Sequence, residues 1–97
     1  MGRLFEQIRA LVSNERYLVG LHASERLEER GILEWQAVAG LESGHLLEEK
    51  PEAVPNPAIE VLEELPDGTE FKAVWSFLPR SNLAKLVTVY FLDGTQS

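Results

Sequence analysis

Apolar residues near the start of the chain recur at steps of three and four, a spacing typical of an amphipathic helix. This apolar stripe consists of Leu4, Phe5, Ile8, Leu11 and Val12. It predicts a helix over residues 3–13. The following run, residues 17–21, contains aromatic and β-branched side chains and predicts a short strand.

Two further helices are predicted in the first half of the chain. Residues 22–30 are rich in Glu, Arg and Leu, which favour a helix, and Gly31 is suited to end it. Residues 34–43 form the next predicted helix, which Gly44 ends. Its buried side is expected to carry Ile32, Trp35, Val38 and Leu41.

The rest of the chain predicts strands. Residues 45–49 form a candidate strand that Pro51 ends. Residues 58–65 fit either a helix that starts at Pro57 or the first strand of a hairpin. We favour the hairpin, because a turn signal at 66–68 separates this segment from a clear strand.

That clear strand covers residues 71–78, in which Phe71, Ala73, Trp75 and Phe77 share one face. Residues 84–92 are almost continuously apolar, which predicts a central strand covered on both faces. The order of elements predicts an α+β fold. Two or three helices should pack on one face of a mostly antiparallel sheet of three to five strands.

Length and composition restrict the protein class. The 97 residues suffice for a single domain, with an N-terminal helix over 1–14, a sheet-and-helix core over 15–92 and a frayed tail over 93–97. We see no apolar run of membrane-spanning length and no signal-peptide core. The chain has no cysteine, which excludes disulfides and thiolate catalysis. We therefore expect a cytoplasmic protein without contact to a membrane.

Charge is distributed unevenly along the chain. The net charge of −7 is unusual for a general nucleic-acid-binding protein, which uses basic side chains to contact phosphates. Residues 1–31 are nevertheless balanced, with five Arg and five Glu, whereas residues 32–97 carry four basic and eleven acidic side chains. Any anion-binding site is thus expected in the first third.

The residues of greatest chemical interest there are His22, Arg26 and Arg30. Their spacing of four places them in one row along a helix. Two like charges at this spacing weaken a helix slightly, so the row is better explained by an anion that faces it. Arg is suited to binding phosphate or carboxylate, and His22 could act as a general acid or base near neutral pH.

A purely structural interpretation stays open. The anions that face the arginines could be Glu48, Glu49 or Glu52 of the same chain. His22 could cap its helix, and if Ser24 were the N-cap, His22 would lie outside the helix.

Other side chains add less. Lys72, Arg80 and Lys85 could each face the row. With two histidines and no cysteine, we expect neither a bound metal nor a cofactor.

A longer pattern resembles a known family. The run Ile8-Arg9, Tyr17 and His22-Ala23-x-x-Arg26-x-x-x-Arg30-Gly31-Ile32 resembles the domain-of-unknown-function 4258 family. The likeness spans nearly the whole chain. Its later matches are Val38, Gly44, Pro51, Pro55, Asp67-Gly68 and Thr88-Val89-Tyr90.

The resemblance implies a fold similar to the RelE/BrnT ribonuclease toxins of bacterial toxin–antitoxin pairs. It implies that His22 is the acid or base and that Arg26 and Arg30 hold phosphates. Lys72 stands where family members often have a histidine, and it would join His22 in catalysis. Arg80 is a further candidate for contact with the anion.

Two functions therefore remain. The first is a metal-independent mRNA endoribonuclease, in which a ribose 2′-hydroxyl attacks the adjacent phosphate; its partners would be RNA, the ribosome and an antitoxin. The second is a non-catalytic protein-interaction or structural module. Formation of a homodimer is compatible with both.

Overall fold

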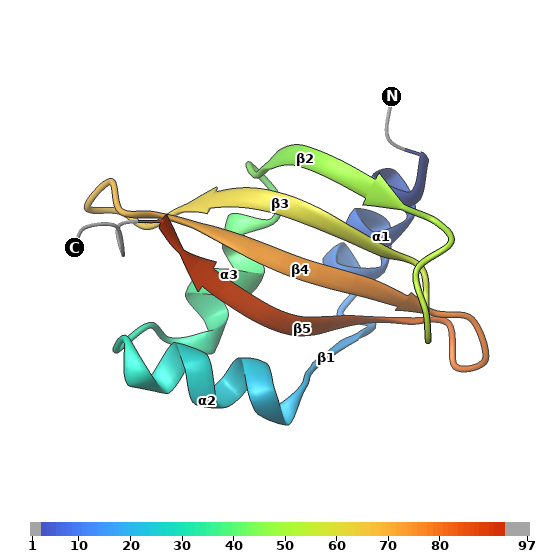
Figure 1. Cartoon of the computed structure of the whole chain (residues 1–97), viewed down its shortest axis with the longest axis horizontal. Helices are drawn as coiled ribbons and strands as arrows, with labels where there is room; N and C mark the ends of the chain where they lie inside the picture. The colour runs from blue at the N-terminus through green and yellow to red at the C-terminus, as the bar shows by residue number, and fades with distance from the viewer. Residues whose placement is uncertain (1–2, 93–97) are drawn as a thin grey trace.

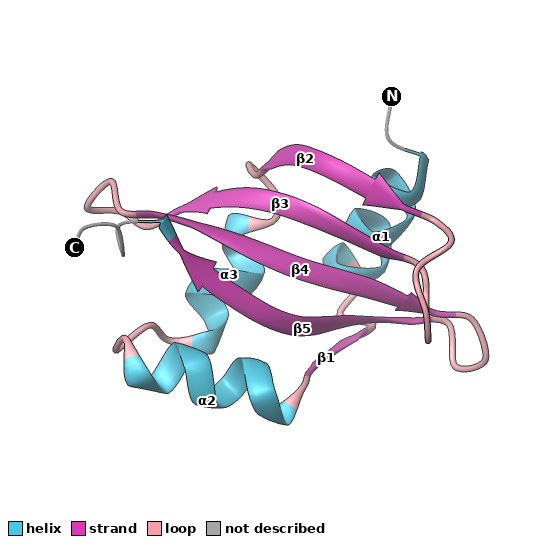
Figure 2. Ribbon diagram, viewed as in Figure 1, coloured by secondary structure: helices cyan, strands magenta, loops and turns pink. Residues whose placement is uncertain are grey.

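The computed structural model describes residues 3–92 of the chain (Figures 1 and 2). The predicted frayed tail at 93–97 lies outside these residues. The elements are α1 (Arg3–Ser13), β1 (Tyr17–Val19), α2 (Leu21–Glu29), α3 (Glu34–Gly40), β2 (His45–Lys50), β3 (Ala58–Glu64), β4 (Glu70–Leu78) and β5 (Leu83–Phe91).

The strands form one sheet in the order β1-β5-β4-β3-β2. Three neighbouring pairs are antiparallel, whereas β1 runs parallel to β5. The predicted α+β fold with a mostly antiparallel sheet is confirmed. The first strand is shorter than the predicted 17–21, because the Gly20 N–H donates to the Leu86 carbonyl and the next residue already begins α2.

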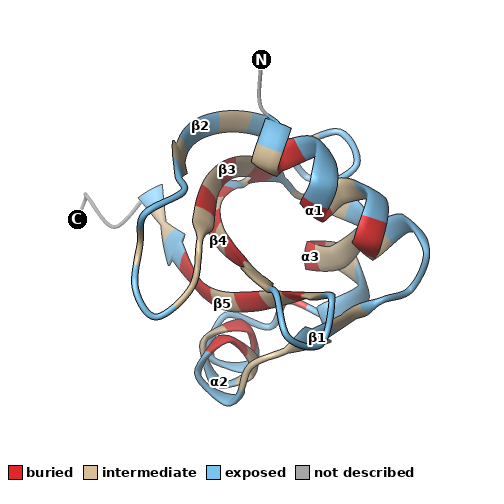
Figure 3. Cartoon of the chain, turned by 90° about the vertical axis from the view of Figure 1, so that its right-hand side faces the viewer, coloured by how far each residue is buried: buried red, intermediate tan, exposed pale blue. Residues whose placement is uncertain are grey.

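The helices are not distributed evenly over the sheet. In Figure 1, α1 and α3 lie behind the sheet, and in Figure 3 the sheet curves around them. The helix α2 instead follows the short strand β1 in the chain and runs alongside β5. One face of the sheet is therefore covered by α1 and α3, and the opposite face carries no helix. We call the latter the helix-free face.

The hydrophobic core lies between the covered face and the helices. Figure 3 shows its buried residues on the strands and on the helix sides that face them. As predicted, Phe71, Ala73, Trp75 and Phe77 share this face; the first three are fully buried and Phe77 is half-buried. Removing each large side chain from water contributes about 1.5–3 kcal/mol to stability. The largest fully buried apolar residues are Trp75, Phe71, Ile8, Leu27, Leu41, Ile59 and Leu86.

The helix α3 differs from its prediction in length and in its buried side. It ends at Gly40 instead of residue 43, and a turn then brings Gly44 against Val61. Ile32 and Leu41 are buried as predicted, but Trp35 is 62% exposed. Ala37 occupies the fully buried position of α3 instead.

The segment with two alternatives forms a strand. Residues 58–64 pair with both β2 and β4, so the helix alternative is wrong. The hairpin turn after β3 is also confirmed. Gly68 there adopts φ +90°, a conformation that glycine takes at low cost, and the Thr69 N–H donates to Asp67 Oδ1 over 2.9 Å.

The last strand is less covered than predicted. It lies inside the sheet, between β1 and β4. Its helix-free side, however, carries an exposed Tyr90 and a half-buried Lys85. The prediction that β5 is covered on both faces is therefore wrong. Its apolar run suggested burial on both sides, but α2 packs beside this strand and leaves its helix-free side without a helix.

Candidate nucleic-acid interface

All three lysines of the chain lie on the helix-free face. The strand register places two of them at the ends of one row across the sheet: Lys85 is opposite Ser76, Ser76 is opposite Ala58, and Ala58 is opposite Lys50. Neighbouring strands lie about 4.8 Å apart, so this row spans roughly 14 Å.

A second row contains the third lysine. Across the sheet, Tyr90 is opposite Lys72, Lys72 is opposite Leu62, and Leu62 is opposite His45. The Lys72 ammonium lies 6.0 Å from the centre of the Tyr90 ring, and that ring is 48% exposed. The row thus combines a cation, an accessible aromatic ring and an imidazole.

Two carboxylates lie between the two rows, because Glu48 of β2 is opposite Glu60 of β3. Glu60 Oε2 accepts a hydrogen bond from Lys50 Nζ over 2.8 Å, and Glu60 Oε1 lies 3.6 Å from Lys72 Nζ. The hydrogen bond from Lys50 is the main reason that the pKa of Glu60 is lowered, and the same bond raises the pKa of Lys50. Glu60 therefore positions two lysines, and together with Glu48 these four groups carry no net charge.

Lys85 forms no salt bridge with any carboxylate among residues 3–92. Its side chain runs against the backbone of Gly20, where an added Cβ would lie 2.9 Å from Lys85 Cε. A larger residue at position 20 would therefore displace the lysine. Lys85 thus presents an ammonium group without a carboxylate partner among residues 3–92. It lies beside Gly20, which precedes His22 by two residues.

The flank of α2 that carries His22 and Arg26 is turned away from α3. Ser24 Oγ donates to Glu34 Oε2 over 3.1 Å, so the opposite flank of α2 faces α3. Residues two apart on a helix differ by about 200° around its axis, which places His22 and Arg26 on the far side. His22 is exposed, whereas Arg26 Nε is buried and has no hydrogen-bond partner among the described residues.

His22 lies inside the helix, as the predicted row requires. Gly20 is the N-cap and Leu21 begins α2, so neither His22 nor Ser24 caps it. The predicted pairing of the arginines with Glu48, Glu49 or Glu52 is wrong. These residues belong to β2 and the segment after it. The strands β3 and β4 separate β2 from β5, and α2 with its arginines packs beside β5. Glu49 Oε2 instead accepts a hydrogen bond from the backbone N–H of Phe5.

Two predicted anion-binding residues lie outside the two rows, Arg30 on the covered side of β5 and Arg80 in the turn before it. The Arg30 guanidinium stacks 4.4 Å from the centre of the Phe91 ring, which itself packs on the core residue Phe71. Arg30 is thus directed to the covered side of β5. Arg80 is exposed in the turn between β4 and β5, five residues before Lys85 and at the other end of β5 from Phe91.

The site and its fold can be compared with known proteins. The profile of the family "Domain of unknown function (DUF4258)" matches residues 20–91, from the N-cap of α2 to the end of β5. The chain belongs to this family. No curated protein and no solved structure is significantly similar to the chain.

Part of the candidate interface of this DUF4258 domain could not be predicted from the sequence. Lys50 and His45 join it only through the pairing of β2 with β3. His45 and Lys50 are five residues apart, and they share a face only because of the irregularity between Leu46 and Glu48, which simple alternation along β2 does not predict. Tyr90 and Lys85 are likewise five residues apart, and they share a face only because β5 has an extra residue between Leu86 and Thr88. The apolar character of β5 moreover suggested burial.

Within residues 3–92, no group of three or more His, Asp or Glu side chains is placed to hold a metal ion. No helix in the same part of the chain is long and apolar enough to span a membrane.

Proposed function

We propose that this DUF4258 domain binds single-stranded RNA across its helix-free face. The observation that carries the proposal is the gathering of all three lysines on this face in a chain of net charge −7. Neutralising phosphates with basic side chains is the main source of affinity for nucleic acid. The lysines provide this locally, although the same face also carries Glu48, Glu60, Glu64 and Glu70. Lys85, which has no carboxylate partner among residues 3–92, is therefore the strongest candidate for a phosphate contact.

The exposed Tyr90 supports a single-stranded ligand. Unpaired bases stack on aromatic side chains, and each stack contributes about 1–3 kcal/mol. Tyr90 and Lys72 are neighbours on adjacent strands, so one nucleotide could place its base on the ring and its phosphate at the ammonium. Glu60 holds Lys72 in this position.

The proposal extends to cleavage of the bound RNA, as the RelE/BrnT likeness implies. The ribose 2′-oxygen would attack the adjacent phosphorus and the bond to the 5′-oxygen would break, which leaves a 2′,3′-cyclic phosphate and a 5′-hydroxyl. His22 would move the proton. Arg26 and Lys85 would stabilise the negative charge that develops on the phosphate, with Lys72 holding the flanking nucleotide.

Cleavage of a defined mRNA tests this extension. We expect the purified protein to cut it in the presence or absence of ribosomes and of EDTA, and the His22→Ala and Arg26→Ala variants to lose about 100-fold or more in rate. The Arg3→Ala variant is the control, because it removes an exposed arginine at the start of α1, outside the proposed interface. Equal cleavage by folded His22→Ala, or no cleavage under any condition, would contradict the catalytic proposal.

A non-catalytic module is the second candidate. It is favoured by the placement of Arg30 on the covered side of β5 and by the pairing of Lys50 and Lys72 with Glu60. On this alternative the domain binds RNA or a protein without turnover. Binding of an antitoxin and formation of a homodimer remain predictions, and light scattering of the purified chain would measure the latter.

A further inference from the structure

A small cavity of about 240 Å³ lies on the helix-free face, beneath the segment that joins β2 to β3. In Figure 1 this segment crosses in front of the sheet near the end of β4 and the start of β5. Its residues 53–56 form the outer wall of the cavity. The floor consists of one residue of β3 and two residues each of β4 and β5, namely Ala58, Val74, Ser76, Lys85 and Val87.

The cavity has a mainly apolar lining. Val74 and Val87 belong to its floor, and Val54 and Pro55 belong to its wall. Binding sites for small molecules typically combine such a lining with a few polar groups that orient the ligand. The volume is below the range of about 300–1,000 Å³ that is usual for drug-sized ligands. Any ligand of this cavity is therefore small.

Ser76 contributes a hydroxyl group without a hydrogen-bond partner. The residue is 5% exposed, and this hydroxyl forms no hydrogen bond with any of residues 3–92. The side-chain amide of the half-buried Asn56 also forms none within this part of the chain. Because buried polar groups in proteins are normally hydrogen-bonded, two such groups lining one cavity indicate a polar ligand atom between them.

Lys85 is the one charged residue among those that line the cavity, and no carboxylate among residues 3–92 pairs with it. Its Nζ atom lies 3.8 Å from the place that a Cβ at Gly20 would occupy. The flexible four-carbon stem lets this ammonium turn towards an anion in the cavity. Ammonium, hydroxyl and amide groups can all donate hydrogen bonds. The polar part of the lining is therefore suited to an anion.

We propose that this cavity binds a small organic carboxylate with an apolar body. The carboxylate would accept hydrogen bonds from Ser76 Oγ, from the Asn56 amide and from Lys85. The apolar body would cover Val74 and Val87 and displace water from them. The site shares Lys85 with the proposed RNA surface, but it does not depend on RNA binding, because the acid would bind to the free protein.

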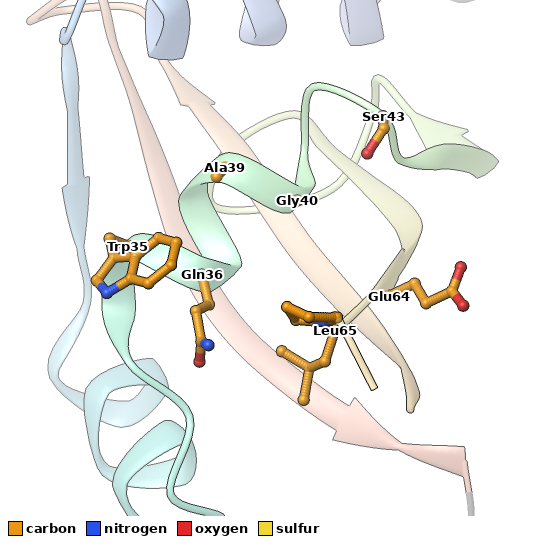
Figure 4. A pocket seen from close by; sticks show the side chains of 8 residues that line it. Trp35, Gln36, Ala39, Gly40, Ser43, Glu64 and Leu65 are labelled. Atoms are coloured by element: carbon orange, nitrogen blue, oxygen red, sulfur yellow. The ribbon is translucent and has the colours of Figure 1, made fainter. Parts of the chain in front are cut away.

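A second hollow offers a comparison within the same molecule. Figure 4 shows Trp35 and Gln36 of α3 at this hollow, which has a volume of about 400 Å³. No lysine or arginine belongs to its lining among the described residues. A molecule that only seeks apolar surface would also bind beside the exposed Trp35, whereas an acid attracted by Lys85 would not.

Chemical-shift mapping of the backbone N–H groups tests the proposal in the absence of RNA. The probes are isovalerate, benzoate and phenylacetate, each compared with its primary carboxamide, which has the same apolar body without the charge. We expect at least one acid to shift the signals of Asn56, Ser76 and Val87 in a saturable manner and to leave Trp35 and Gln36 unchanged. Its carboxamide should bind about tenfold more weakly or less.

The Lys85→Gln variant should bind the acid about tenfold more weakly, and Ser76→Ala, which removes only Oγ, should also weaken binding. The matched control is Arg3→Gln, which removes the same charge from an exposed position at the start of α1 and should bind like the wild-type protein. Equal melting temperatures would show that the variants fold normally.

Four results would each overturn the proposal. They are the absence of a saturable shift with any of the acids, equal binding of acid and carboxamide, equal binding by folded Lys85→Gln, and shifts centred on α3. None of them depends on whether the protein binds RNA, so failure of this proposal is distinct from failure of the proposed function.

Discussion

The Glu63→Gln variant is expected to be more stable than the wild-type protein at pH 7, with a free energy of unfolding about 3 kcal/mol higher. Glu63 points from β3 into the core and is 1% exposed. Burial raises the pKa of its carboxyl from 4.5 to about 8, and the hydrogen bond that Trp75 Nε1 donates to Oε2 over 3.3 Å offsets only part of this. The other oxygen, Oε1, has no hydrogen-bond partner among the described residues.

The expected gain depends on pH in a defined direction. Between pH 4.5 and about 8, the folded protein keeps the Glu63 proton while the unfolded chain has lost it. The free energy of unfolding therefore falls as the pH rises through this window, by about 1.4 kcal/mol per unit. Glutamine resembles the protonated acid and does not ionise, so its variant lacks this dependence.

Urea unfolding at pH 4.5, 7 and 8.5 measures the effect. The difference between Glu63→Gln and the wild-type protein should be smallest at pH 4.5 and should grow with pH. The matched control is Glu64→Gln, because Glu64 is the next residue along β3 and is exposed. If the Glu63→Gln and wild-type curves remain parallel over the whole range, the carboxyl group is ionised in the folded protein and the interpretation is wrong.

The Ile8→Ala variant should lose about 2–5 kcal/mol of stability. Ile8 is fully buried at the centre of α1, and Phe5 and Leu11 of the same helix also belong to the core. The family match begins at residue 20, so α1 lies outside it. The expected loss would show that this helix is nevertheless an integral part of the folded domain.

The control for Ile8→Ala is Leu21→Ala, which removes a side chain of similar size from a position that is 77% exposed. Its effect should stay within about 0.5 kcal/mol. Urea midpoints of the two variants, measured under the same conditions, give the comparison. Equal effects at both positions would contradict the packing of α1 against the sheet.

Local patterns predicted the individual elements better than their packing. The apolar stripe of α1 and the alternation in β4 correctly identified the buried faces, because both depend on neighbours along the chain. Trp35 was predicted to lie in the core because of its position in the helical repeat. Its exposure depends on Ala37 fitting closer to the sheet, and that contact cannot be read from α3 alone.

The candidate site was predictable only in part, for the same reason. The row on α2 follows from the spacing of His22 and Arg26 within one helix. The gathering of Lys50, Lys72 and Lys85 depends on the register of four strands, which brings together residues up to 35 positions apart. The sequence contains no local signal for that arrangement.

Amide chemical-shift mapping with a single-stranded RNA oligonucleotide tests most directly whether the helix-free face is the functional surface. The account predicts shifts that saturate with RNA concentration at Lys72, Lys85 and Tyr90, with weaker effects around His22 and none on α1. These shifts should diminish as salt is added. Shifts centred on α1 or α3, or no shifts at low salt, would contradict the assignment of RNA binding to this face.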